Sequence, residues 1–321
     1  MKDQSYLVTG GTGTFGHAFV RYALDHDVRR IRVLSRDELK QHEMRLAFPD
    51  PRLEFFLGDV RDRQRLRLAF SSHPDVIIHA AALKQVPACD YNPDEAVATN
   101  VTGAQNVLAA ARELQVPKVI LLSSDKACDP CTTYGKTKAL AECLFVQSNA
   151  YSSATRSAVV RYGNVVGSRG SVIPLWLHQA SHAQSLTVTH PEATRFWWSI
   201  DAAVKFVVDA LDEMQGGEIF VPKLQSAMLR DICNGIVPHA LLETCGLRAG
   251  EKMHELMISR EESHHTIVDG ERFVIQPSDP QWLYEPRGLA VQADTERDWC
   301  YSSEDEVRAV VSVSASEVVL A

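Results

Sequence analysis

Hydrophobic positions in the first half of the chain form short apolar runs that are separated by stretches with helical periodicity. Five apolar runs predict strands, at residues 6–9, 31–34, 53–57, 76–80 and 118–123. Amphipathic stretches between them predict helices, for example at residues 15–24 and 95–114. Continuous apolar runs suit strands that are buried on both faces of a parallel sheet. The alternation therefore predicts an α/β protein with a Rossmann-type, doubly wound parallel sheet.

The alternation weakens after Gly163. Residues 204–211 still predict a helix and residues 217–221 a strand, but turn signals cluster beyond Pro222. We therefore predict a smaller C-terminal substrate-binding region beside the sheet. The Rossmann domain is expected to take residues 1–165 and 199–221, and the substrate-binding region residues 166–198 and 222–321. Residues 307–319 fit a helix or a strand, and their pattern does not decide between them.

The net charge and the hydropathy of the chain limit the kinds of partner and the cellular compartment that we expect. The net charge of -8 over 321 residues disfavours nucleic acid and anionic membranes as partners. No apolar run approaches the roughly 20 residues of a membrane helix, and no signal peptide is visible, so we expect a soluble, cytoplasmic protein.

Seven scattered cysteines also favour a reducing compartment. Cys128 and Cys131 have CxxC spacing. A redox or zinc site would require a helix start or a second ligand pair. Neither is visible, so we predict free thiols and no metal.

A glycine-rich turn links the first predicted strand to the first predicted helix. Residues 10–16 read GGTGTFG, in which Gly10 allows the tight turn, Gly13 lets the backbone approach a pyrophosphate, and Gly16 lets the helix pack closely. A purely structural turn is the alternative, but the strand–turn–helix context favours nucleotide binding by the helix N-terminus. The predicted cofactor contacts in this turn are Gly10, Thr12, Gly13, Thr14, Phe15 and Gly16.

The end of the second predicted strand bears on the choice between NAD and NADP. An acidic residue there binds the ribose of NAD, whereas an arginine accommodates the 2′-phosphate of NADP. Ser35 and Arg36 come first, with Asp37 next and Lys40 close behind, which favours NADP. In the alternative, the basic residues are solvated surface charges and Asp37 binds the ribose of NAD.

Two further strand ends are expected to face the cofactor. Asp59 and Val60 follow the third strand and are placed for the adenine, although Asp59 also fits a plain loop residue. Ala80 and Ala81 follow the fourth strand, and their small side chains let the backbone pass close to the cofactor.

Residues 123–138, SSDKACDPCTTYGKTK, carry the candidate chemistry. Tyr134 and Lys138 are four apart, so they share a helix face, where the lysine charge can lower the pKa of a proton-transferring tyrosine. Ser124, Asp125 and Lys126 follow the fifth strand, at the sheet edge where open α/β sheets bind ligands. In the alternative, Tyr134 and Lys138 lie on an exposed helix face, and Asp125 and Lys126 form a local ion pair without a catalytic role. The glycine-rich turn upstream indicates a bound dinucleotide and therefore favours the catalytic interpretation.

Several stretches together are similar to one enzyme family. They are TGGTGTFG at 9–16, SRDELKQHEM at 35–44, GDVRD at 58–62, HAAALKQVPACDYNPDEAVATNVTGAQNV at 79–107, SDKACDPCTTYGKTK at 124–138, RYGNVVGSRGSVIP at 161–174, TRFW at 194–197 and GLRAGEKMHE at 246–255. On these residues the chain resembles the inverting UDP-N-acetylglucosamine 4,6-dehydratases. The chain departs from the family pattern at four places. Ala249 stands where proline is expected, and Ser124 stands where threonine is common. The cysteines at 128 and 131 are not typical, and the C-terminal tail lacks the expected aromatic cluster.

The resemblance implies a mechanism for the candidate residues. Tyr134 takes the C4 hydroxyl proton while NADP accepts hydride. Lys126 then removes the C5 proton, and Asp125 protonates the departing C6 hydroxyl. For these roles Lys126 requires a pKa lowered toward neutrality, and Asp125 must retain its proton.

The resemblance also implies the ligand contacts and the assembly. Lys84 and Asn100 are placed at the cofactor. The residues placed at the UDP-sugar are Lys84, Asn164, Val172, Thr189, Arg195 and Arg248. A homo-oligomer, with a hexamer as one form, is expected from the family.

Two other functions fit parts of the sequence. A UDP-sugar 4-epimerase or a retaining dehydratase would use the same fold with a different outcome. A non-enzymatic NADP-sensing regulator is the alternative outside enzymes, and the presence of both Tyr134 and Lys138 counts against it.

Overall fold

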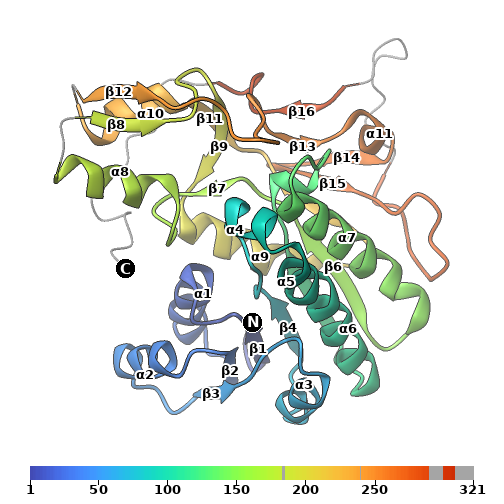
Figure 1. The fold of residues 1–321 in the computed structure, drawn as a ribbon. Coiled ribbons are helices and arrows are strands. Elements are labelled where there is room, and N and C mark those ends of the chain that lie inside the picture. The colour runs from blue at the N-terminus through green and yellow to red at the C-terminus, as the bar shows by residue number, and fades with distance from the viewer. Residues whose placement is uncertain (183–184, 239, 289–298, 308–321) are drawn as a thin grey trace.

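The computed structural model of the protein describes residues 1–182, 185–238, 240–288 and 299–307. Within these residues a nine-stranded sheet forms the centre of the molecule (Figure 1). Its strands run, from one edge to the other, in the order β14 (Thr266–Asp269), β15 (Arg272–Ile275), β10 (Ile219–Pro222), β6 (Arg156–Val160), β5 (Lys118–Leu122), β4 (Val76–His79), β1 (Ser5–Thr9), β2 (Arg30–Ser35) and β3 (Leu53–Leu57). The strands from β10 to β3 are parallel, and β15 is antiparallel to both of its neighbours. This confirms the predicted Rossmann-type sheet.

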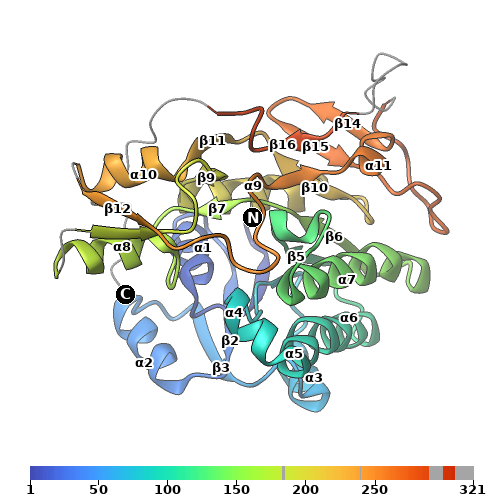
Figure 2. The ribbon, with the colours of Figure 1, turned by 45° about the horizontal axis from the view of Figure 1, so that its top comes forward.

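Helices cover both faces of the sheet, as Figures 1 and 2 show. On one face lie α3 (Arg63–Phe70), α6 (Gly103–Glu113) and α7 (Thr133–Gln147), and on the other α1 (Thr14–Leu24), α2 (Glu38–Ala47) and α9 (Ile200–Glu213). Successive side chains of a strand point to opposite faces of the sheet, which explains how one strand contributes to both hydrophobic layers. In β1, Leu7 packs in the first layer, whereas Tyr6 and Val8 pack in the second. All three side chains are buried, which is why the strand is a continuous apolar run.

The predicted elements agree closely with those observed in the first half of the chain. The five predicted strands and the helix at 15–24 each end within one residue of an observed element. The helix predicted over 95–114 is divided into α5 (Pro93–Ala96), a π-helical turn η1 (Val97–Thr102) and α6. Three further short helices lie in this half: α4 (Val86–Tyr91), η2 (Asp125–Ala127) and η3 (Ser148–Tyr151). The apolar pattern also underlies β6, which the sequence analysis did not single out.

The second half of the chain builds a smaller unit above the carboxyl ends of the parallel strands. A three-stranded sheet contains β7 (Asn164–Val165), β9 (Thr194–Trp198) and β11 (Gln225–Met228), and β8 (Ser185–Val188) pairs with β12 (Leu241–Thr244). The helices here are α8 (Val172–Ala180), α10 (Leu229–Ile236) and α11 (Arg260–Ser263), and β13 (Leu256–Ile258) pairs with β16 (Tyr301–Ser302). Ile173, Trp176 and Trp197 belong to a hydrophobic cluster that is separate from the two layers of the central sheet.

The observed sheet crosses the predicted domain division at one place. Strands β14 and β15 extend the central sheet beside β10, although residues 222–321 are predicted to belong to the substrate-binding region. Of the undecided segment 307–319, Val307 forms a bridge with Ser226, and the remaining residues lie outside the described part of the chain.

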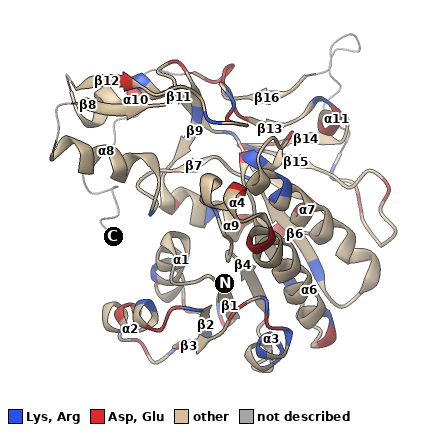
Figure 3. Cartoon of the chain, in the orientation of Figure 1, with Lys and Arg blue, Asp and Glu red and all other residues tan. Residues whose placement is uncertain are grey.

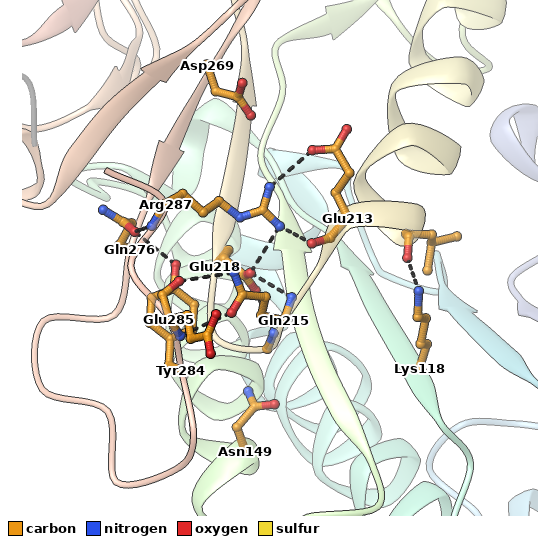
Figure 4. A network of polar contacts seen from close by, with 12 residues as sticks. Lys118, Asn149, Glu213, Gln215, Glu218, Asp269, Gln276, Tyr284, Glu285 and Arg287 are labelled. Atoms are coloured by element: carbon orange, nitrogen blue, oxygen red, sulfur yellow. Dashed lines mark hydrogen bonds and ion pairs between the residues drawn. The ribbon is translucent and has the colours of Figure 1, made fainter. Parts of the chain in front are cut away.

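A polar network, drawn in Figure 4, fastens the segment after β15 to the central sheet. The fully buried Glu218 accepts hydrogen bonds of 2.7 Å from the backbone N–H groups of Gln215 and Gly216. The guanidinium of Arg287 lies 3.6 Å from the same carboxylate and donates to the carboxylate of Glu213 over 3.1 Å. The arginine thereby offsets the charges of two acidic side chains that precede β10.

Charged side chains of both signs are interspersed on α2, whereas the charged residues of α3 are all arginines (Figure 3). Among the described residues, no helix combines the length and apolarity that crossing a membrane requires. The same residues contain no group of three or more His, Cys, Asp or Glu side chains arranged to hold a metal ion. Cys128 and Cys131 are free thiols, the first buried and the second exposed.

Candidate active site

A cavity of about 1050 Å³ lies at the carboxyl ends of the parallel strands. Its walls combine residues from the glycine-rich turn, the ends of β2 and β5, helix α7, and the smaller unit formed by β7, α8 and β9. The order of the strands reverses between β1 and β4, and open α/β sheets bind their ligands at such a point. The fold therefore places the cavity where a dinucleotide and a second ligand can meet.

The glycine-rich turn leaves room for a phosphate group. Gly10 has a φ of +67°, and a Cβ at this position would lie 2.7 Å from the Cα of Ala81. Helix α1 begins at Thr14 with Gly13 as its N-cap, and neither a capping side chain nor an acidic residue occupies its first turn. Its N–H groups are thus available to an anion in the cavity, and the turn fits a dinucleotide pyrophosphate. A Cβ on Gly16 would collide with the carbonyl of Gly11, so this glycine serves the packing of α1 and does not line the cavity.

The end of β2 presents basic side chains to the same cavity. Strand β2 ends at Ser35, and Arg36 and Lys40 line the cavity next to it. Asp37 also lines the cavity, but its carboxylate caps α2 by accepting a 3.0 Å hydrogen bond from the N–H of Lys40. The Arg36 guanidinium is half-exposed and lies 3.5 Å from the carboxylate of Asp59.

The other predicted cofactor residues divide into cavity-lining and supporting ones. Thr12, Thr14, Phe15, Val60, Ala80, Ala81 and Lys84 line the cavity. Asn100 lies behind the wall. Its amide donates to the Leu83 carbonyl and to the Thr137 hydroxyl, over 3.0 Å each, and its side-chain oxygen accepts from the N–H of Leu83. Asn100 thereby ties the loop after β4 to α7, and the direct cofactor contact predicted for it stays a prediction.

Tyr134 and Lys138 lie one turn apart on α7 and both line the cavity. Lys138 is buried, and its ammonium donates a 2.6 Å hydrogen bond to the carbonyl of Leu122 at the end of β5. Burial lowers the pKa of Lys138 to about 8. Burial raises the pKa of Tyr134 to about 12, against the opposing effects of the Lys126 charge and a hydrogen bond with Ser124. The charge of Lys126 therefore favours the phenolate of Tyr134.

Asp125 and Lys126 form a partly buried ion pair in η2, directly after β5. The Lys126 ammonium lies 3.2 Å from Asp125 Oδ1, which also accepts a 2.9 Å hydrogen bond from the Ser124 hydroxyl. Burial raises the pKa of Asp125, as the predicted acid role requires. Ser124 and Lys126 line the cavity, whereas Asp125 is only 1% exposed and lies behind them.

Lys126 has a second acidic partner that was not predicted from the sequence. Glu255 Oε1 lies 3.1 Å from the Lys126 ammonium. Burial would lower the pKa of Lys126, but the carboxylates of Asp125 and Glu255 outweigh it and raise the pKa above its ordinary value. The lowered pKa that the base role requires therefore stays a prediction for the complex with cofactor. Glu255 ends the stretch GLRAGEKMHE, but no spacing rule connects it with a lysine 129 positions earlier.

The predicted substrate residues also come together at the cavity. They are Lys84, Asn164, Val172, Thr189, Arg195 and Arg248. Arg195 is buried and already engaged, because it donates to Glu251 over 2.9 Å and to the carbonyls of Thr194 and Met253. Helix α8 begins here with Ser171 as an N-cap that makes no side-chain capping bond, so a second set of helix N–H groups faces the cavity.

Comparison with known proteins places the chain in a family. The family described as polysaccharide biosynthesis protein matches residues 6–277. The chain belongs to this family. A curated relative from Campylobacter jejuni named UDP-N-acetylglucosamine 4,6-dehydratase (inverting) is 46% identical over 86% of this chain and 84% of its own length. A relative from Rickettsia felis named UDP-glucose 4-epimerase is 42% identical over 81% of this chain and 79% of its own length.

Solved structures share the fold. Pen from Bacillus thuringiensis is 34% identical, with a TM-score of 0.86 over 95% of each chain. A dTDP-glucose 4,6-dehydratase from Streptomyces venezuelae, solved with NAD bound, is 22% identical, with a TM-score of 0.71 over 78% of this chain and 86% of its own. These likenesses support the fold of this chain.

Proposed function

We propose that the protein is an NADP-dependent UDP-N-acetylglucosamine 4,6-dehydratase that inverts C5. The observation that carries the proposal is the grouping of Tyr134, Ser124 and Lys126 on one cavity wall, with Asp125 directly behind. Hydroxyl, amine and carboxyl groups within a few ångströms supply the bases and the acid that dehydration requires. The relative from Campylobacter jejuni, named for this activity, supports the choice among related reactions.

The first half of the reaction uses Tyr134. A bound nicotinamide would supply the hydride acceptor for C4 and return the hydride to C6 later. Tyr134 accepts the proton of the C4 hydroxyl, and the neighbouring Lys126 ammonium stabilises the phenolate that this role requires. Ser124 holds the phenol oxygen by its hydrogen bond and fixes the direction from which the substrate hydroxyl approaches.

The second half eliminates water across C5 and C6. The ketone at C4 makes the C5 proton acidic, and the amine of Lys126 removes it once the ammonium has released its own proton to solvent. Asp125 supplies the proton for the departing C6 hydroxyl, and its burial favours the protonated form. Because Asp125 does not line the cavity, the Ser124 hydroxyl, which contacts both the carboxyl and the cavity, is the route for this proton.

Recognition of the two nucleotides follows from the charges at each end of the cavity. Arg36 and Lys40 favour NADP, because Asp37 is engaged as a helix cap and two cations adjoin the end of β2. The UDP diphosphate would bind near the N-terminus of α8 and Arg248. The sugar nucleotide would be surrounded by Lys84, Asn164, Val172, Thr189 and Arg195.

The proposal also includes the domain division, the location and the assembly. We propose a cofactor domain and a sugar-nucleotide region, a cytoplasmic location, and a homo-oligomer with a hexamer as one form.

Mass spectrometry of the reaction products tests the function. The protein is incubated with NADP and UDP-N-acetylglucosamine, and the account predicts a nucleotide sugar that has lost one water. The relative from Rickettsia felis makes a UDP-glucose 4-epimerase the second candidate, so UDP-glucose is tested in parallel. A product of unchanged mass whose configuration at C4 has altered would favour the epimerase and contradict the proposal.

A further inference from the structure

Glu255 is a buried carboxylate placed against the candidate base. It directly precedes β13, the strand that packs against η2. Its side chain is 4% exposed, and its Oε1 atom lies 3.1 Å from the Lys126 ammonium. The same oxygen lies 3.8 Å from Nε of Arg195. Two cations therefore converge on one carboxylate beside the cavity.

The backbone of Glu255 is fixed independently of its side chain. Its N–H donates to the Ser303 hydroxyl over 2.9 Å, and its carbonyl accepts from the Ser303 N–H over 2.9 Å. The Ser303 hydroxyl also contacts the hydroxyl of Thr194, the first residue of β9. A residue far along the chain thus holds Glu255 in register with Lys126, and the carboxylate has little freedom to move away.

The charged groups around Lys126 come from three elements. Asp125 adjoins it in η2, Glu255 precedes β13, and Arg195 on β9 acts as an opposing cation, while the phenol of Tyr134 on α7 faces the ammonium. Around Glu255 the charged neighbours are Lys126, Arg195 and Lys252.

The two carboxyl groups that contact Lys126 favour opposite protonation states. Burial raises the pKa of Asp125, and its Oδ2 atom has no hydrogen-bond partner within the described part of the chain. Burial also acts to raise the pKa of Glu255, but Lys126 and Arg195 outweigh it, so the pKa of Glu255 falls below its ordinary value. Of the two carboxyl groups, Glu255 is therefore the more readily ionised.

We propose that Glu255 is the counter-ion of Lys126: a positioning residue that holds the ammonium at the cavity wall and controls when it releases its proton. The ion pair itself follows from the geometry, whereas its consequence for catalysis rests on the proposed dehydratase function. With Glu255 ionised, the ammonium loses its proton to solvent less readily. The amine lone pair that takes the C5 proton then forms only at higher pH.

Competitive labelling of the full-length protein measures this coupling without any turnover. Short pulses of acetic anhydride at a series of pH values, followed by mass spectrometry of the peptide that contains Lys126, give the midpoint at which this amine becomes reactive. Glu255→Gln removes the charge but keeps an acceptor, and it should lower the midpoint by about 1–3 pH units. Glu251→Gln is the matched control: it makes the same change beside Arg195 but has no contact with Lys126, so the midpoint should move much less than in Glu255→Gln.

Glu255→Asp provides a second variant if Glu255→Gln does not fold. It keeps the charge near Arg195 but withdraws the carboxylate by one methylene, so a smaller shift in the same direction is expected. Unchanged midpoints in both Glu255 variants would overturn the proposal, as would an equal shift in Glu251→Gln.

Turnover by the same proteins separates this proposal from the function. The rising limb of the pH–rate profile for dehydration should move to lower pH in Glu255→Gln, together with the labelling midpoint. A shifted midpoint with an unshifted rising limb would overturn the catalytic part. If the unmodified protein releases no water from UDP-N-acetylglucosamine, the proposed function fails, while the labelling result still decides the ion pair.

Discussion

Replacing Arg36 with alanine is the most direct way to test how the cavity distinguishes NADP from NAD. Arg36 lines the cavity at the end of β2, and the nearest anion to its guanidinium is the Asp59 carboxylate at 3.5 Å. A ribose 2′-phosphate is a stronger partner than this long contact, because it can accept two parallel hydrogen bonds from the guanidinium. Arg36→Ala should therefore weaken NADP binding and leave NAD binding nearly unchanged.

The structure places the size of this effect at the lower end of the usual range. A hydrogen bond to a charged group contributes about 1.5–3 kcal/mol. Because 53% of the Arg36 side chain is exposed, solvent screens its charge and we expect about 1.5 kcal/mol, or about tenfold in Kd. Loss of Arg36 also leaves Asp59 near the 2′-phosphate, so the variant should show a reduced preference for NADP at every salt concentration.

Calorimetric titration of NADP and NAD into the unmodified and variant proteins measures the preference as a ratio of two Kd values. Arg45→Ala is the matched control, since it removes the same charge from α2 at a residue that stacks on Phe55 and does not line the cavity. Its effect should be small at physiological salt, where the screening length is about 8 Å. Equal weakening of both cofactors by Arg36→Ala, or no NADP preference in the unmodified protein, would refute the reasoning.

Three further substitutions test other parts of the account. Tyr134→Phe should fold and bind NADP but lose about 10²- to 10⁴-fold in turnover, measured by steady-state assay, because the C4 hydroxyl lacks its base; near-normal turnover would exclude the role. Lys126→Ala should still reduce NADP in a single turnover, seen as NADPH absorbance, but release no water; dehydration at the native rate would exclude Lys126 as the C5 base. Arg161→Met should lower the free energy of unfolding by about 3–5 kcal/mol in urea titrations, because the buried carboxylate of Glu142 and the partly buried one of Glu262 lose their shared partner; a change under about 1 kcal/mol would contradict this.

The sequence predicts the parts of this protein whose signals are local. Strand β1 could be predicted because a strand that is buried on both faces requires a continuous apolar run. The turn at Gly10 could be predicted because a φ of +67° favours glycine. The spacing of Tyr134 and Lys138 likewise follows from the helix period. The π-helical turn within the helix predicted at 95–114 could not be predicted, because such a turn changes the hydrogen-bond register of the backbone without changing the amino-acid composition.

The remaining site features depend on contacts between distant segments. Glu255 meets Lys126 only because β13 packs beside η2, and Asn100 reaches Leu83 only because the loop after β4 folds over η1. The pKa of Lys126 depends on these neighbours, whereas the lowered pKa expected from the sequence was a requirement of its role as a base. β14 and β15 joined the central sheet for the same reason: strand pairing beside β10 leaves no local mark in the sequence.

The most direct test of the central claim is proton NMR of the product formed from UDP-N-acetylglucosamine in heavy water. If Lys126 removes the C5 proton and a solvent proton returns from the opposite face, the 4-keto-6-deoxy product carries deuterium at C5 with inverted configuration. The hydrogen that arrives at C6 by hydride return comes from C4 of the substrate, so that position receives protium. Retained configuration at C5 would contradict the inverting assignment, and a product that still bears its C6 oxygen would contradict dehydration itself.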